Sequence, residues 1–239
     1  MTDNTPSASS RSWIARHSAY LFVGGFGLVF TVGGLLLLLV AVPSQQTDSA
    51  TLDALAVVSP LTSPGQPDGT RVLLEARIAS DTPERFRDFV AYQRREFRGW
   101  KEDGARRREQ WATTEVVTPA LVLGEPPHRV TVASPDYELA LPPHTWQSGE
   151  NLVYLAFGEK TQGADGFRRG DAVTADGVLE RGPQGRAIRI TTLAGGSAAA
   201  YRDSRRRSVQ DLLIVGRIFA AVGATLCVTV LVVGWRRAR

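Results

Sequence analysis

Two long apolar stretches constrain this chain of 239 residues more than any other feature. The first, Tyr20–Val42, is 23 residues without a charge, and a helix of that length rises about 34 Å, enough to cross a bilayer core. The second, Leu212–Trp235, has one charge, Arg217, near its start. We expect this arginine to extend its guanidinium to the headgroups, and a functional buried charge is the alternative. The sequence therefore predicts two transmembrane helices.

A cleaved signal peptide is the alternative interpretation of the first stretch. The apolar part of a signal peptide is normally about 7–15 residues long and ends at a small-x-small cleavage site. Tyr20–Val42 is longer, and the PSQQ that follows offers a poor site. We therefore expect a retained membrane anchor.

The basic residues beside the two stretches predict their orientation. Arg11 and Arg16 precede the first stretch, and RRAR follows the second. Short cytoplasmic segments are enriched in Lys and Arg, so both termini are expected in the cytoplasm. Arg205–Arg207 oppose this, but long loops cross a membrane largely regardless of charge. The expected division is 1–19 cytoplasmic N-terminal tail, 20–42 first transmembrane helix, 43–70 linker, 71–204 β-rich extracytoplasmic domain, 212–235 second transmembrane helix and 236–239 cytoplasmic C-terminal tail.

Both apolar stretches have small residues at helical spacing. Such residues let helix backbones approach closely in lipid, although Gly and Ala are also simply common in membrane helices. Our hypothesis is that the two helices pack against each other or against the helix of a partner, in a homo-oligomer or with another membrane protein. The candidate packing residues are Gly24, Gly27, Thr31, Gly34, Gly216, Ala220 and Ala224.

The segment between the apolar stretches has the pattern of a β domain. Apolar and polar residues alternate along 71–80, which is typical of a half-buried strand. A second alternating run, 172–179, leads through a Gly-Pro turn to the returning Ile188 and Ile190, and Gly177 within it permits sharp coiling. Shorter candidate strands lie at 119–124, 128–133, 137–142 and 151–158. This rhythm favours a mainly-β, small OB-like barrel.

Residues 84–117 are ambiguous between a helix and a hairpin. Phe86, Phe89, Val90, Phe97 and Trp100 are nearly at helical spacing. The β-branched run 113–117 and the turn-like KEDGA favour a long charged hairpin, which is our prediction.

Charge and reactive residues exclude several classes of function. Residues 43–204 have 19 basic and 22 acidic side chains, so this segment has no positive field for nucleic acid. The single Cys227 excludes an intrachain disulfide and a zinc site built from cysteines. His17, His128 and His144 occur singly, so we expect no metal and no cofactor. Asp171 and Asp176, an odd number of positions apart, are expected on opposite faces of a strand rather than as a catalytic pair.

The run from Gly170 to Leu213, GDAVTADGVLERGPQGRAIRITTLAG followed by a polar stretch into the second apolar segment, resembles the GIDE-type membrane ubiquitin ligases. FVAYQRREF and WATTEVVTPALVLG loosely resemble an earlier hairpin of that family. The resemblance implies a bacterial relative with two spans and a middle domain that acts as a binding module. Four residues after Trp235 provide no RING and no zinc-binding cysteines, so the ligase activity is not implied.

These observations predict a non-catalytic, two-span bacterial membrane protein whose β domain binds a partner protein or assists a membrane complex. A membrane enzyme that uses carboxylates, or His128 and His144, in an unrecognised site is the alternative. A third hypothesis is a small subunit of a larger complex, docked through the small residues of its helices.

Overall fold

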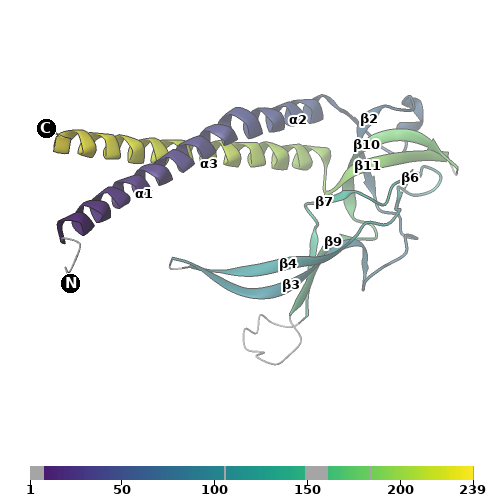
Figure 1. Ribbon diagram of the computed structural model, residues 1–239. Coiled ribbons are helices and arrows are strands. Elements are labelled where there is room, and N and C mark those ends of the chain that lie inside the picture. Colours follow the sequence, from purple (N-terminus) through teal and green to yellow (C-terminus); the bar gives the residue numbers. More distant parts are fainter. Residues whose placement is uncertain (1–7, 105, 149–160, 184, 239) are drawn as a thin grey trace, which may run out of the picture. The chain divides into compact units, whose positions relative to one another are not determined.

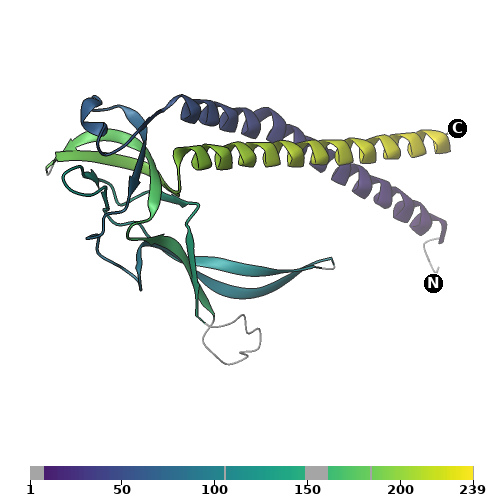
Figure 2. The same cartoon turned by 180° about the vertical axis from the view of Figure 1, so that it is seen from behind.

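The computed structural model describes residues 8–104, 106–148, 161–183 and 185–238. It divides into two units, which are described separately (Figures 1 and 2). The helical unit contains the chain up to Asp53 and from Ser204 onward, and the β unit is Ala54–Asp203. The candidate strand at 151–158 lies outside the described residues.

The helical unit is built from two long helical segments. The first runs through α1 (Ala8–Leu36), a π-helical turn η1 (Leu37–Ala41) and α2 (Val42–Ala54). The second is α3 (Ala198–Ala238), whose first residues belong to the β unit. Both are long and apolar enough to cross a membrane, by length and composition. Only 17% and 11% of their most apolar stretches are buried, unlike the core helix of a soluble protein.

The first helical segment continues through the region expected to be a linker. Pro43 lacks an N–H, and inside a helix its ring collides with the carbonyl four residues earlier. The π-helical turn directly before it, closed by the Val42 N–H donating to the Leu37 carbonyl, widens the helix at this point. Helix α2 therefore continues to Ala54, and the strand β1 (Ala56–Val58) follows.

The β unit contains two sheets. The seven-stranded sheet has the order β1-β2-β10-β11-β6-β5, with β7 paired to β11, and the four-stranded sheet has the order β4-β3-β9-β8. The remaining strand bounds are β2 Arg71–Arg77, β3 Phe89–Asp103, β4 Arg106–Val117, β5 Val122–Leu123, β6 Val130–Val132, β7 Glu138–Ala140, β8 His144–Gln147, β9 Gln162–Arg168, β10 Ala172–Gly182 and β11 Gly185–Gly195.

The predicted hairpin at 84–117 is confirmed. Strands β3 and β4 pair antiparallel from Tyr92 with Val117 to Asp103 with Arg106, and Gly104 in the turn has a positive φ of 62°. The predicted closed barrel is wrong, because in the described residues no ladder joins the two edges of the seven-stranded sheet. A single bridge between Ile78 and Leu123 brings β5 beside the end of β2. Pro126 and Pro127 follow soon after and have no N–H with which to extend this pairing.

The core of the β unit is formed mainly by the inner face of the seven-stranded sheet. Val72 and Leu74, predicted on one face of their strand, are completely buried there, and so are Leu179, Ile188 and Leu193. Gly177 lies at a β-bulge, where a Cβ would stand 2.4 Å from the carbonyl oxygen of Arg189. This close approach explains the glycine in an otherwise apolar strand.

The loop at 59–70 is held in place by hydrogen bonds and an ion pair. It contains the short 3-10 helix η2 (Ser63–Gly65), and Ser63 is buried. The Arg186 guanidinium, from the start of β11, donates to the Gln66 carbonyl at 2.6 Å and pairs with the Asp68 carboxylate. This part of the expected linker is therefore attached to the neighbouring hairpin.

Candidate functional site

The candidate packing residues of the first apolar stretch lie at a close contact between α1 and α3. A Cβ on Gly34 would stand 2.5 Å from the backbone nitrogen of Ala220, and one on Gly27 would stand 3.0 Å from the Cys227 Sγ. The Thr31 hydroxyl donates to the Gly27 carbonyl at 2.8 Å, so this donor is satisfied within α1. Gly24 has more room, because its nearest neighbour would be 3.7 Å away. We call this contact the helix seam.

The candidates of the second stretch fall partly outside the helix seam. Gly216 lies against Leu38, but Ala224 is exposed, and Gly223 is buried in its place against Thr31. The reason is geometric, since two steps of four residues drift by about 80° around a helix, whereas steps of four and three return to within about 20°. A stripe spaced four and three apart, which includes Gly223, would have indicated the observed face.

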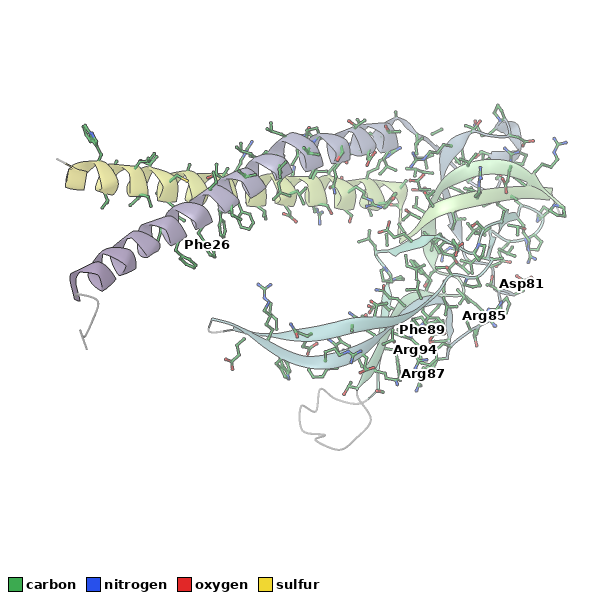
Figure 3. All side chains as sticks on the ribbon, in the orientation of Figure 1. Phe26, Asp81, Arg85, Arg87, Phe89 and Arg94 are labelled. Carbon is green, nitrogen blue, oxygen red and sulfur yellow. The ribbon has the colours of Figure 1, made fainter. Side chains whose placement is uncertain are left out.

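The apolar stretches of the two helices present apolar side chains outward, with Arg217 as the charge on the second stretch. Phe22, Phe26 (labelled in Figure 3) and Leu39 are well exposed on the first helical segment, and Leu231 and Trp235 on α3. Arg217 is also exposed, and no acidic side chain of the described residues pairs with it. These surfaces suit lipid or another apolar helix, and Arg217 is free to extend toward headgroups.

Two buried carboxylates in the β unit each form an ion pair with an arginine. Asp176 receives both Nε and Nη2 of Arg71, at 3.0 and 2.9 Å. Asp165 accepts from Arg95 at 2.7 Å and from the Thr145 hydroxyl at 2.8 Å. Buried charges that are paired and hydrogen-bonded in this way are typical of structural roles.

One histidine–carboxylate pair forms outside these structural pairs. His144 Nε2 lies 2.9 Å from Asp171 Oδ1, and the other carboxylate oxygen accepts the Arg168 backbone N–H at 2.7 Å. His128 is exposed in the loop after β5. Asp171 precedes β10 and Asp176 lies within it, and the two carboxylates have different partners. Within the described part of the chain, no three His, Cys, Asp or Glu side chains gather in a group that could hold a metal ion.

A cluster of aromatic rings and arginines covers one face of the four-stranded sheet. It consists of Phe86, Arg87, Tyr92, Arg94 and Trp146, which we call the aromatic–arginine patch. The Phe86 ring lies 5.3 Å from Tyr92 and 5.4 Å from Trp146. The Arg87 guanidinium lies 4.0 Å above the Trp146 ring, and that of Arg94 lies 5.2 Å from Phe86. Figure 3 labels Arg87 and Arg94 in this part of the β unit.

Small residues on the middle strand make the patch possible. In the sheet register Tyr92 on β3 and His144 on β8 both stand opposite Gly166, and Arg94 and Trp146 both stand opposite Ala164. Directly paired residues share a face, so β9 presents only a glycine and an alanine in these rows. Large side chains from β3 and β8 can therefore meet above β9, and Phe86 closes over them.

The patch has polar surroundings. Arg94 also pairs with Glu115 at 3.1 Å and donates to Gln162 at 2.5 Å. These residues, with Glu96 and Thr114, line a shallow hollow beside the rings. Burial, and second the Glu115 charge, raise the pKa of the Tyr92 phenol, so Tyr92 stays a neutral part of the patch.

Sequence reasoning did not find the patch. The local sequence pattern places Phe86 and Tyr92 in a helix or a hairpin, and it assigns no element to Trp146. The available signal was the pair of small residues in GADGF, alternating with Asp165 on a strand, which leaves space on one face of a sheet.

Comparisons of the chain with known protein families, with curated proteins and with solved structures find no match. The arrangement of the site is therefore interpreted from its own geometry.

Proposed function

We propose that this protein is a non-catalytic, two-span membrane protein whose tethered β unit binds a partner protein through the aromatic–arginine patch. Both termini are cytoplasmic in this proposal, and the β unit is extracytoplasmic. The single observation that carries it is the meeting of Phe86, Tyr92 and Trp146 under two arginines on one sheet face.

The membrane part of the proposal rests on the two apolar helices. Their exposed apolar faces are costly in water, at roughly 25 cal/mol per Å² of apolar surface. The helix seam leaves these faces outward, because the small residues are the ones used in the contact. Lipid around the pair removes that cost.

The binding part of the proposal rests on composition and access. Tryptophan, tyrosine and arginine are the residues that most often dominate the energy of protein interfaces. Arg87 is exposed, and Phe86 and Trp146 are only half-buried, so a partner can reach the rings. The middle domain of the GIDE-type ligases acts as a binding module, and the resemblance to that family supports the same function while staying a prediction.

Site-specific photo-cross-linking tests the proposal. A photo-reactive phenylalanine analogue in place of Arg87, in the full chain expressed in its own cells, is expected to give one discrete cross-linked product. The matched control is the same analogue in place of Arg181, whose side chain is 85% exposed on the β10–β11 hairpin. Trp146→Ala should abolish the product at position 87. Equal products from both positions, or none from position 87, would contradict the proposal.

The His144–Asp171 pair supports the second candidate, a membrane enzyme with a histidine–carboxylate site. A carboxylate that orients a histidine is a common part of general acid–base sites. Alanine at His144 or Asp171 should then abolish function in cells lacking the chromosomal copy, while Trp146→Ala should leave it intact. The reverse pattern is expected for the binding function.

A further inference from the structure

The β3–β4 hairpin has a part that extends beyond the rest of its sheet. The last residue of β3 that pairs with β9 is Glu96, and the two strands continue as a pair from Phe97 to Asp103 and from Arg106 to Trp111. We call this part the hairpin extension. In the described residues it is a two-stranded ribbon, visible at the end of β3 and β4 in Figure 1.

Three aromatic rings are gathered on the hairpin extension. The Phe97 ring lies 5.3 Å from Trp111 and 5.8 Å from Trp100, edge to face in both cases. All three residues are half-buried, and Trp111 lies against Gly163 of β9 with the Arg95 guanidinium 5.3 Å from its ring. The Trp111 indole N–H donates to Glu109 at 2.8 Å, so one of the acidic charges on the ribbon is already engaged. Trp side chains with an apolar body and a polar edge are characteristic of membrane interfaces.

The charge on the hairpin extension is opposite to that on the rest of the β unit. Residues 98–111 have five basic and three acidic side chains, a net charge of +2, while Ala54–Asp203 has 19 basic and 20 acidic, a net charge of −1. The remainder of the unit is therefore at −3. Arg98, Lys101 and Arg108 are exposed on the ribbon. Basic residues attract the anionic headgroups of a nearby lipid surface.

The helical connections between the apolar stretches and the β unit are short. If the apolar stretches span the bilayer, the helical residues that connect them to the β unit are 42–54 and 198–211, each about 20 Å long at most. From Phe97 to Asp103 the hairpin extension adds seven residues, or about 23 Å. The two covalent tethers also hold the ribbon at a high effective concentration near the lipid.

We propose that the hairpin extension binds the surface of the bilayer, with Trp100 and its neighbouring rings at headgroup level and the basic side chains on anionic phosphates. The occupant is a lipid surface and not a second protein, because the ribbon combines interfacial aromatics with a local positive charge on a domain tethered at both ends. This inference rests on the proposed membrane anchoring, but not on the aromatic–arginine patch.

Nitroxide accessibility in the reconstituted full chain tests the inference. In a Cys227→Ser background, labels are placed singly at Glu102→Cys on the hairpin extension, Arg181→Cys on the β10–β11 hairpin and Val29→Cys on α1. Vesicles of phosphatidylcholine are compared with vesicles of phosphatidylcholine and phosphatidylglycerol. The collision rates with oxygen and with a water-soluble nickel chelate are measured by power saturation.

The expected result is a severalfold lower collision rate with the chelate at position 102 than at position 181, with the larger difference in the anionic vesicles. The combined change Trp100→Ser and Lys101→Glu in a label-bearing chain should remove that difference. Equal chelate access at positions 102 and 181 in both vesicles would overturn the inference. Protection at position 102 from both reagents, independent of lipid charge, would indicate a protein contact and would overturn it as well.

The label at Val29 separates the two proposals. If it collides with oxygen and not with the chelate while position 102 is fully aqueous, the anchoring stands and the lipid-binding role of the hairpin extension falls. If Val29 itself is open to the chelate, the anchoring fails, and the lipid-binding inference fails with it.

Discussion

The helix seam and the four-stranded sheet pack their contacts in opposite ways. In the helix seam, Gly34 and Gly223 leave no room for even one added carbon atom, and Gly27 leaves very little. In the sheet, Gly166 and Ala164 leave space that large rings and arginines from the adjoining strands fill. The helix seam therefore depends on the close approach of two backbones, whereas the sheet contact depends on large side chains that fill the space above small ones. Adding atoms should break the helix seam, and removing atoms should break the sheet.

The largest effect is expected from removing a buried ring in the four-stranded sheet. Phe89 is completely buried beside Tyr92, so Phe89→Ala should lower the free energy of unfolding of the β unit by about 4 kcal/mol. Phe97→Ala, on the hairpin extension, is the control and should cost less than half as much because Phe97 is only half-buried. Urea unfolding of the full chain in mild detergent measures both. Equal losses of unfolding free energy would show that a large side chain contributes no more in the sheet than on the hairpin extension.

The next effect is expected from adding atoms in the helix seam. A Cβ on Gly34 would overlap the Ala220 backbone, whereas one on Gly33 meets nothing within 4 Å. Gly34→Leu should therefore separate the helices at a cost of about 3 kcal/mol, and the neighbouring Gly33→Leu should be nearly neutral. Unfolding in a detergent titration gives the free energy. Pulsed EPR between labels at Val32→Cys and Val222→Cys, in a Cys227→Ser background, gives the separation, and an unchanged distance in Gly34→Leu would contradict the seam.

A smaller effect is expected from removing one partner of a buried ion pair in the sheet. Arg95→Met leaves the Asp165 carboxylate, with a side chain 11% exposed, to its remaining donors, and should cost about 2 kcal/mol. The control Arg98→Met removes a 49% exposed arginine that pairs with Glu96, and should change stability by less than about 0.5 kcal/mol. Thermal unfolding followed by circular dichroism distinguishes the two. Similar values would mean that Asp165 is not dependent on its arginine.

The smallest effect concerns alkaline pH. Burial raises the pKa of Tyr137, whose hydroxyl donates to the Pro119 carbonyl at 2.8 Å, and raises that of Tyr92. Above about pH 10 the unfolded chain releases these phenolic protons while the folded chain retains them, so the free energy of unfolding falls as pH rises. Tyr137→Phe should flatten this decline more than Tyr92→Phe, as measured by urea unfolding from pH 8 to 11, roughly the range that brackets the free phenol pKa. An unchanged slope in both variants would contradict the assignment.

The sequence predicted the elements better than their assembly. The long apolar helices and the hairpin from Phe89 to Val117 follow from local composition and turn residues, and both are present. The closed barrel failed because closure depends on pairing between distant edges, and β5 is only two residues long. Ala224 fell outside the helix seam because a repeat of four residues departs from the helical period.

The candidate site was harder to predict because its residues are brought together by the pairing register of separate strands. Tyr92 and Trp146 are far apart in the sequence, and only the pairing of β3, β9 and β8 brings them to one face. The contact of His144 with Asp171 has the same origin. Pattern within a single strand indicates which residues alternate, but not which residues of other strands they meet.

The attachment of the loop at 59–70 to the neighbouring hairpin affects the susceptibility of this protein to proteolysis. An exposed connection with several prolines, serines and glycines would normally be the first place where a peptide bond is cut. Here Arg186 clamps Gln66 and Asp68, and the cut would require that clamp to open first. Arg186 therefore acts together with the backbone hydrogen bonds between Gly69, Thr70 and Leu179 to protect the connection between the first long helix and the rest of the β unit from proteolysis.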